Sequence, residues 1–272
     1  MIRVSIVVSA YDNWHALDRT LLGYRCQREP CDELIVAEDS EFAETAEVVA
    51  RHRALATFPI LHLTQPDLGF RKCTILNRAI AHASGDWLVF TDADCVPRDD
   101  LVAAYRRLAA PGRFVAGGSS LSIPAPFHRE RLTDAMIESQ QLFDPVFLAA
   151  HGVRVPALRL TRNRLLARML DRLTPRDTFV GCNSGAWRSD LLRVRGFDES
   201  MAYGGEDRNL GYRLNHAGVR GVRARYSIVW VHLDHARSYA HADVMRANRA
   251  HNAQVRRLRQ TQPRHSALAA AC

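Results

Sequence analysis

The stretch WLVFTDAD, from Trp87 to Asp94, leads from an apolar run into two aspartates. A short, continuously apolar run is typical of a strand that is buried on both faces, and we expect a strand over residues 86–91. Asp92 and Asp94 are separated by one residue, so both carboxylates can point the same way where the chain leaves the sheet. Mg²⁺ is commonly bound by one or two carboxylates together with substrate phosphates. Two aspartates after a strand also serve as turn residues, so the pair alone leaves both interpretations open.

Before this stretch, apolar runs of strand length alternate with segments of helix length. The expected strands are residues 4–9, 33–37 and 60–63, and the expected helices are residues 14–26, 43–55 and 71–83. The alternation predicts an α/β fold with a mostly parallel central sheet flanked by helices, in which ligands bind at the carboxyl ends of the strands. Polar residues do follow the predicted strands, namely Tyr11, Asp12, Glu38, Asp39, Asp92 and Asp94.

After this stretch the pattern is less regular. We expect a strand over residues 114–123, with Gly117 and Gly118 allowing close approach of the backbone. The chain then turns helical and lacks strands from about residue 129 to residue 174. The expected elements that follow are strands 179–183 and 225–231 and helices 189–194 and 206–217. Beyond His241 the arginine-rich chain predicts a helix or a frayed tail rather than more core.

The composition favours one large domain with anionic partners. The chain has 272 residues, 47% of them hydrophobic, and a formal net charge of +8. Lys72 is the only lysine, so the positive charge is almost entirely arginine, which suits bidentate contact with phosphate and carboxylate. Nucleotide diphosphates, an anionic membrane surface and nucleic acid all fit this charge. The six cysteines form no CxxC pair, which favours reduced thiols in a cytosolic protein.

Two features bear on membranes. No stretch reaches the roughly 18 uninterrupted apolar residues of a membrane span, and the amino terminus is interpreted as a first core strand. Residues 158–173 interleave leucines and a methionine with five arginines, a pattern that suits a basic amphipathic helix on an anionic membrane surface. An ordinary helix that packs one stripe on the core fits the same pattern equally well. Any membrane contact is therefore expected to be peripheral.

Several motifs in order along the chain resemble one enzyme family. They are Ser5 to Tyr11, Leu68 to Lys72, Leu76 to Ala79, Asp92 to Asp94, Gly181 to Gly185, Gly196 to Glu199, and Gly204 to Asp207. Together they are similar to a family 2 glycosyltransferase of the GT-A fold, with a carboxyl half similar to the galactosyltransferase-type C-terminal domain. The resemblance covers about residues 4–235.

The resemblance implies a pocket for the nucleotide. The acidic residue that ends the second strand contacts the base in that family, which corresponds here to Asp39, while the role of its neighbour Glu38 stays open. Ala10, Tyr11 and Asp12 would line the base pocket, and Arg71 would reach the nucleoside or its phosphates. Tyr11 also fits a strand-end aromatic residue that covers the core, and Arg71 fits a solvated arginine at a helix start.

The resemblance also implies the reacting groups. The aspartate of Glu206-Asp207 corresponds to the catalytic base of the family, and Glu206 to a carboxylate that binds the acceptor. Acidic residues at a helix start are also favoured by the helix dipole without any catalytic role. The related C-terminal domains supply one metal-binding histidine at the end of the last strand, and His232 is the first candidate and His235 the second. Asp92, Asp94 and His232 would then hold a divalent cation, Mn²⁺ or Mg²⁺.

The combined hypothesis is an inverting, metal-dependent transfer of a sugar from a nucleotide diphosphate-sugar, UDP-sugar first, to a glycan or lipid-linked acceptor. Such a protein would be cytoplasmic, with peripheral association at the inner face of the membrane and no nucleic-acid partner. The chain would divide into a nucleotide-sugar-binding half (1–125), a helical insertion (126–176), an acceptor and catalytic half (177–240) and a basic C-terminal helix or tail (241–272). A sugar-phosphate nucleotidyltransferase, or a non-catalytic sugar- or nucleic-acid-binding protein, are the alternatives.

Overall fold

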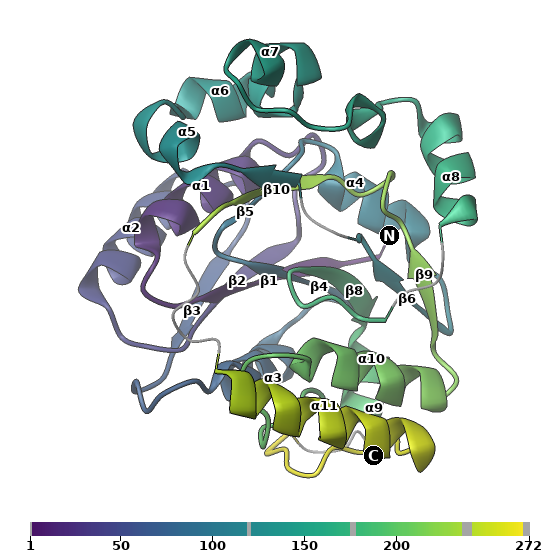
Figure 1. The fold of residues 1–272 in the computed structure, drawn as a ribbon. Helices are drawn as coiled ribbons and strands as arrows, with labels where there is room; N and C mark the ends of the chain where they lie inside the picture. The colour runs from purple at the N-terminus through teal and green to yellow at the C-terminus, as the bar shows by residue number, and fades with distance from the viewer. Residues whose placement is uncertain (1, 119–120, 175–177, 236–240, 269–272) are drawn as a thin grey trace.

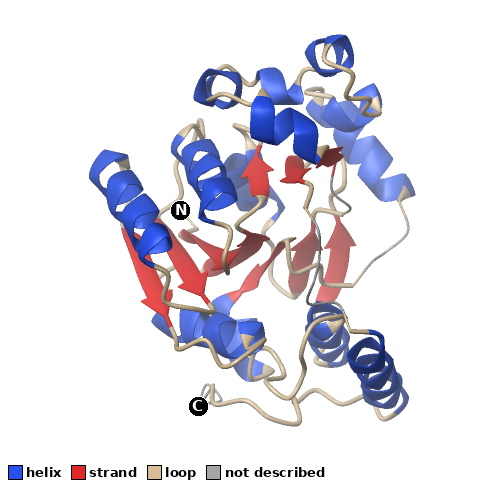
Figure 2. Cartoon of the chain, turned by 60° about the vertical axis from the view of Figure 1, so that its left-hand side comes forward, coloured by secondary structure: helices blue, strands red, loops and turns tan. Residues whose placement is uncertain are grey.

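The computed structural model describes residues 2–118, 121–174, 178–235 and 241–268. Its centre is a seven-stranded sheet with the strand order β3-β2-β1-β4-β8-β6-β9 (Figure 1). These strands are β1 (Val4–Ala10), β2 (Glu33–Glu38), β3 (Ile60–Thr64), β4 (Trp87–Asp92), β6 (Arg113–Ala116), β8 (Asn183–Trp187) and β9 (Arg220–Arg223). Helices cover both faces of this sheet (Figure 2). The predicted α/β class with flanking helices is therefore confirmed.

The first half of the sheet follows the sequence pattern closely. Strands β1, β2, β3 and β4 are parallel, and β1 lies between β2 and β4. The expected crossover helices are present as α1 (Trp14–Arg25), α2 (Ala43–Leu55) and α3 (Lys72–His82). Parallel pairing aligns Ser9 with both Ala37 and Asp92, so the strand ends that carry polar residues meet at one edge.

Apolar side chains pack on both faces of the sheet. On one face, the strands contact α1, α2 and α4 (Leu101–Leu108) through a cluster that includes Leu17, Leu21, Val102 and Tyr105. On the other face, they contact α3, α9 (Arg188–Arg193) and α10 (Glu206–His216) through a cluster that includes Phe90, Ile75, Leu191 and Leu210. Strands buried on both faces explain why these runs are apolar without alternation.

Three expected strands of the second half are corrected by the structure. The strand expected over residues 114–123 is split into β6 and β7 (Leu121–Ile123), which belong to different sheets. The strand expected over residues 179–183 lies later in the chain, as β8, and pairs antiparallel with β4 and β6. The strand expected over residues 225–231 is replaced by β9 and β10 (Trp230–Leu233). These strands are short, so partners distant in the chain decide their bounds.

A second, three-stranded sheet with the order β5-β10-β7 stands beside the main one. Strand β5 (Cys95–Pro97) directly continues from the two aspartates after β4, and it pairs antiparallel with β10, which places His232 opposite Cys95. Strand β10 also pairs with β7 in parallel. The small sheet therefore brings residues near position 232 to the end of β4.

The segment after β7 is helical, as expected, and covers the small sheet (Figure 1). It contains α5 (Ala125–Glu130), α6 (Asp134–Glu138), α7 (Pro145–Ala150) and α8 (Arg164–Leu173), with 3-10 turns at Gln141–Phe143 and Ala157–Leu160. Its apolar side chains form a cluster with Val96 and Val231 of the small sheet and with Val229, which directly precedes β10.

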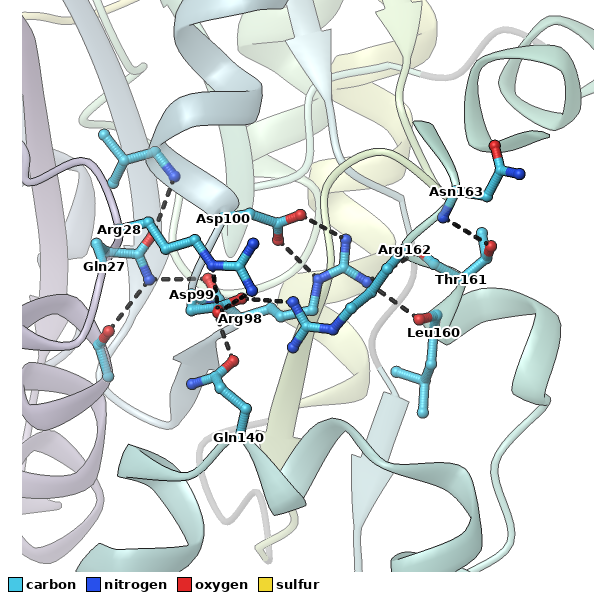
Figure 3. A network of polar contacts seen from close by, with 12 residues as sticks. Gln27, Arg28, Arg98, Asp99, Asp100, Gln140, Leu160, Thr161, Arg162 and Asn163 are labelled. Atoms are coloured by element: carbon cyan, nitrogen blue, oxygen red, sulfur yellow. Dashed lines mark hydrogen bonds and ion pairs between the residues drawn. The ribbon is translucent and has the colours of Figure 1, made fainter. Parts of the chain in front are cut away.

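A polar network fastens this helical segment to the end of β5 (Figure 3). Arg98 binds the Asp100 carboxylate through two nitrogens, at 2.7 and 3.0 Å, and donates to the carbonyls of Leu160 and Thr161. Asp99 accepts from Arg28 and from Arg162, at 2.7 and 2.8 Å. The Arg98–Asp100 pair is largely buried, and a buried charge pair is costly unless it is well hydrogen-bonded, as Arg98 is here. The hydrogen bonds of Arg98 to Leu160 and Thr161 thus fix the position of the segment.

Helix α8 is shorter than the amphipathic helix expected over residues 158–173, because residues 161–163 interrupt it. Only Ala167 of this helix is buried, while Leu165, Met169 and Leu173 are 81%, 53% and 76% exposed. These three residues follow each other at a spacing of four, so they form one apolar stripe on the helix surface. Within the described residues, we find no helix long and apolar enough to cross a membrane.

The C-terminal region is a helix that belongs to the folded body. Helix α11 (Ala242–Arg257) packs against α10, with Asn248, His251 and Val255 buried. After it the chain returns to the main sheet, where Leu268 is 7% exposed and joins the cluster around α3. The expectation of a helix is met, but the region contributes to the core, contrary to the expectation of a peripheral tail.

Candidate active site

A cavity of about 570 Å³ opens at the carboxyl ends of β1, β2 and β4. Most of the residues singled out from the sequence line it: Ala10, Tyr11, Asp39, Asp92, Asp94, Glu206, Asp207, His232 and His235. They come from both halves of the chain, and parallel pairing together with the small sheet brings them to one place. This is the position where open α/β sheets bind ligands.

Strand pairing sets the positions of the two aspartates after β4. Asp92 is opposite Ser9 of β1, and the Ala93 amide donates to the Ser9 carbonyl at 2.8 Å. The next residue, Asp94, is 8% exposed, and its carbonyl accepts from the Leu233 amide at 2.9 Å. Asp94 is therefore held against β10 by a backbone contact, with its side chain facing His232 of that strand and His235 just after it.

Two histidines converge on a single carboxylate oxygen. Nε2 of His235 lies 2.7 Å from Oδ2 of Asp94, and Nε2 of His232 lies 3.4 Å from the same oxygen. Potential ligand atoms of the three residues all lie within 4.8 Å of one another. Burial by itself raises the pKa of Asp94, but hydrogen bonds from both histidines outweigh it and hold that pKa well below its usual range. One carboxylate and two imidazoles are ligands that suit a manganese-like cation.

Asp92 has a different partner. Its Oδ1 accepts from Nζ of Lys72 at 2.6 Å. Lys72 is the first residue of α3. Burial lowers the pKa of Lys72, but the charges of Asp92 and Glu206 outweigh it and raise that pKa above its ordinary value. Lys72 is the single lysine of the chain, and it was not predicted from the sequence as a site residue. Its position next to Arg71, in a motif already singled out, was the available signal.

Asp39 lies at the end of β2 as expected, on the wall of the cavity. Its carboxylate is 5% exposed and accepts from Gln65 Nε2 at 2.5 Å and from the Arg71 amide at 2.7 Å. Burial raises the pKa of Asp39. Gln65, which the sequence analysis missed, thus orients this carboxylate.

The neighbour Glu38 is fully buried and binds within the protein. It accepts from the Ser40 hydroxyl at 2.8 Å and from the Phe42 amide at 3.1 Å, and it pairs with His62 at 2.7 Å. These contacts occupy both of its oxygens. Glu38 therefore orders the turn after β2 and does not line the cavity.

The remaining candidates for nucleotide contact are placed unequally. Tyr11 is 49% exposed at the cavity rim, and its hydroxyl donates to Asp67 at 3.0 Å. Asp12 is exposed and is not among the residues that line the cavity. The guanidinium of Arg71 donates to the Pro66 carbonyl at 3.1 Å, and this side chain also lies outside the lining.

Glu206 and Asp207 open helix α10 at the opposite wall. Gly204 and Gly205 precede them with φ of 109° and 100°, a left-handed conformation that strongly favours glycine. Asp207 accepts from the Gly181 amide at 3.0 Å, while Glu206 accepts from the Gly204 amide at 2.8 Å. Burial, with the nearby charge of Asp207, raises the pKa of Glu206. The glycines thus direct two carboxylates into the cavity at the start of a helix.

Comparisons with known proteins identify the class of this site. A family model for glycosyl transferase family 2 matches residues 5–193, well over half of the chain. The chain therefore belongs to glycosyl transferase family 2. A second family model, described as the N-terminal domain of galactosyltransferase, matches residues 165–241, in the carboxyl part of the chain. The resemblance seen in the motifs is confirmed.

The chain is also similar to individual enzymes. It is 26% identical over 280 residues to an uncharacterized glycosyltransferase of Bacillus subtilis, covering 92% of this chain and 69% of that protein. It is 28% identical over 231 residues to the validoxylamine A glucosyltransferase of Streptomyces hygroscopicus, covering 82% of this chain and 54% of that protein. The chondroitin synthase of Escherichia coli is 25% identical over 229 residues, with 79% of this chain and 32% of the synthase covered. The chain thus spans from 32% to 69% of the length of these three relatives.

Solved structures share the fold at lower identity. A mannosyltransferase from Pyrobaculum calidifontis, in complex with GDP-Man and Mn²⁺, superposes with a TM-score of 0.60 at 22% identity, covering 93% of this chain and 62% of that one. GalNAc-T7 with UDP, GalNAc and Mn²⁺ has a TM-score of 0.60 at 13% identity, covering 94% and 49% of the two chains. The chain therefore has the GT-A fold of these glycosyltransferases.

Proposed function

We propose that this protein transfers a sugar from a nucleotide diphosphate-sugar to an acceptor hydroxyl with inversion at the anomeric carbon. The observation that carries the proposal is the convergence of Asp39, Asp92, Asp94 and Asp207 with His232 and His235 around one cavity of about 570 Å³. The carboxylates stand at opposite walls, one group on the main sheet and the other at the start of α10. A donor bound between them presents its anomeric carbon to a hydroxyl beside Asp207.

Asp207 is the general base of this reaction. The acceptor oxygen attacks the anomeric carbon directly, and its proton passes to the Asp207 carboxylate. The bond between the anomeric carbon and the phosphate oxygen breaks, and the nucleoside diphosphate leaves with that electron pair. A carboxylate suffices as base because the hydroxyl loses its proton late, as the new bond forms. The Gly181 amide, 3.0 Å from Asp207, orients the base.

Asp92, Asp94, His232 and His235 would hold a divalent cation, Mn²⁺ or Mg²⁺. The fit rests on the buried carboxylate of Asp94 and on two imidazole nitrogens directed at it. The ligand atoms of both histidines lie within 4.8 Å of a ligand atom of Asp94, so we propose that His235 is a ligand together with His232. A bound cation neutralises the charge that develops on a departing diphosphate. Lys72, fixed by Asp92, adds a positive charge near the same position.

We propose UDP-sugars as the first donors to test and a glycan or lipid-linked molecule as the acceptor. The solved structure of GalNAc-T7 holds UDP, whereas the mannosyltransferase holds GDP-Man. The nucleobase of the donor is therefore to be identified by a screen of nucleotide sugars. Asp39, which the resemblance assigns to base recognition, has its orientation fixed by Gln65. Polysaccharide or lipopolysaccharide-type glycan synthesis is the proposed role.

The proposed location is the cytoplasmic face of an anionic membrane, with α8 as the contact. Its exposed stripe of Leu165, Met169 and Leu173 is accompanied by three exposed arginines, Arg164, Arg168 and Arg172. Apolar side chains that enter the acyl region, flanked by cations that meet lipid phosphates, are typical of interfacial helices. The positive charge of these arginines complements the negative charge of anionic lipids, which favours an anionic lipid surface as the partner of α8.

Substitution of Asp207 tests the catalytic proposal. We expect Asp207→Asn to reduce sugar transfer by about 10²- to 10⁴-fold, the contribution typical of a positioned general base. Release of nucleoside diphosphate from a panel of nucleotide sugars, with Mn²⁺ present, measures the effect. Asp243→Asn, an exposed aspartate on α11, is the matched control and should behave as the unchanged protein.

The same assay separates the alternatives. A nucleotidyltransferase would release pyrophosphate from a nucleoside triphosphate and a sugar phosphate, and a non-catalytic binding protein would release nothing from any donor. If neither the unchanged protein nor Asp207→Asn consumes a nucleotide sugar in the presence of metal, the proposal is wrong.

A further inference from the structure

A second cavity of about 460 Å³ lies between α10 and α11 and shares a wall with the first. Tyr203, Glu206 and Asp207 line both cavities. A molecule in the second cavity therefore lies next to the proposed base, Asp207. Its volume is within the range of about 300–1,000 Å³ that is usual for small-molecule sites.

Arginines dominate this second cavity. Arg208 comes from α10, directly after Asp207, and Arg249 and Arg256 come from α11. All three are exposed, and in the described part of the chain none of them has a carboxylate within ion-pair distance. Arg249 and Arg256 are seven residues apart, which places them on one face of α11 about 10 Å apart along its axis. The only carboxylates in the lining are Glu206 and Asp207, at the end shared with the donor cavity.

Arginines of α11 that lie outside the second cavity have different partners from those inside it. Arg246 is fully on the surface and pairs with Asp243 at 3.1 Å, as a solvated helix arginine commonly does. Arg256 instead stacks over the ring of Tyr212, with its guanidinium carbon 5.4 Å from the ring centroid. Stacking of this kind holds the guanidinium plane in place and leaves its N–H groups available for bidentate contact with a carboxylate or phosphate.

We infer that the cavity between α10 and α11 binds an anionic group, a carboxylate or a phosphate, carried by the acceptor whose hydroxyl meets Asp207. This inference rests on the proposed function and adds the chemical class of the acceptor. Three like charges around one cavity repel each other unless an anion compensates them. An anionic acceptor removes that repulsion and is at the same time oriented with a hydroxyl at the base.

Binding of defined glycosides tests the inference without relying on turnover. The probes are p-nitrophenyl β-D-glucuronide, p-nitrophenyl β-D-glucoside 6-phosphate and the neutral p-nitrophenyl β-D-glucoside, titrated calorimetrically into the protein with UDP and Mn²⁺. We expect one of the anionic probes to bind more tightly than the neutral one. The double variant Arg249→Ala/Arg256→Ala should weaken that anionic probe by about tenfold or more, the loss of a charge-assisted hydrogen bond, and leave the neutral probe unchanged.

The matched control is Arg246→Ala/Arg257→Ala, which removes the same charge from α11 outside the cavity. It should bind all three probes as the unchanged protein does. The inference is overturned if no anionic probe binds more tightly than the neutral glucoside, or if the control weakens binding equally. Which anionic probe responds distinguishes a carboxylate acceptor from a phosphorylated one. Release of UDP from UDP-sugars, measured separately, reports on the proposed function whatever the result of the titration.

Discussion

At the scale of single residues, Asp94 is the buried carboxylate on which the two histidines of the site converge. It is buried, its backbone carbonyl is tied to β10, and both neighbouring histidines direct Nε2 at one of its oxygens. Removing the charge of such a carboxylate leaves the imidazoles without their common partner. The proposed cation site therefore depends on Asp94 more than on the half-buried Asp92, which Lys72 also contacts.

We predict that Asp94→Asn weakens Mn²⁺ binding by at least about 100-fold, since even residues behind a metal ligand typically contribute 10–100-fold. His232→Ala and His235→Ala should each weaken it as well, because both are proposed ligands. Titration of Mn²⁺ followed by electron paramagnetic resonance measures the affinity, and Asp243→Asn is the control. Unchanged affinity in Asp94→Asn would remove this residue from the proposed site.

At the scale of elements, the exposed stripe of α8 has no packing partner among the described residues. Its three large apolar side chains are more than half exposed, whereas apolar side chains in α7 and the adjoining turns form the cluster over the small sheet. Burial of one leucine is worth about 1.5–3 kcal/mol. Two leucines of the stripe are thus enough to change binding to a lipid surface measurably.

We predict that Leu165→Ser/Leu173→Ser reduces co-flotation with phosphatidylglycerol vesicles by about tenfold or more without altering the fold, as surface substitutions change stability by about 0.5 kcal/mol or less. Added salt should weaken binding of the unchanged protein, because it screens exposed charges. Phosphatidylcholine vesicles should bind little, because this lipid carries no net charge for the arginines to meet. Leu55→Ser, at a 56% exposed leucine ending α2, is the matched control. Equal flotation of control and double variant would exclude α8 as the contact.

At the scale of the whole molecule, one buried carboxylate joins the C-terminal region to the loop between α9 and α10. Asp198 is fully buried and accepts from the hydroxyl of Ser200, the imidazole of His251 on α11, and the amides of Arg264 and His265. Burial raises the pKa of Asp198, but these hydrogen bonds outweigh it and lower that pKa. Asp198 thus adds a buried contact to α11, whose Asn248 and Asn252 also bind the loop before α10 and the start of that helix.

We predict that Asp198→Asn lowers the free energy of unfolding by about 1–3 kcal/mol at neutral pH, the cost of leaving buried hydrogen-bond donors without their acceptor. Because the folded pKa lies below the unfolded value of about 3.9, this stabilisation is fully present above pH 4 and is lost as the pH falls through the folded pKa. The difference between variant and unchanged protein should therefore shrink in acid. Urea denaturation at several pH values measures it, with Asp243→Asn as control. A difference that is constant with pH would contradict this account.

The first half of the fold was predictable because its signals are local. A run such as Val4 to Ser9 is mostly apolar and is followed by a helix-length segment, so the α/β class and the parallel direction of these strands follow from the pattern alone. The second half was predicted less well. Gly117 and Gly118 interrupt what looks like one strand, and β8 and β9 pair with strands far away in the chain, so their bounds depend on those partners.

The sequence by itself determined the α/β class, the family and the acidic residues at the strand ends, because strand and helix periodicity and motif order are written in consecutive residues. Only the tertiary structure decided which of these residues meet. Asp94 and His235 are 141 positions apart and come together because β5 pairs with β10. The arginines of α11 lie near Asp207 because Asn252 of α11 binds Asn209 and the Gly205 carbonyl at the start of α10. Contacts of such separation follow from packing and strand pairing, which no local pattern encodes.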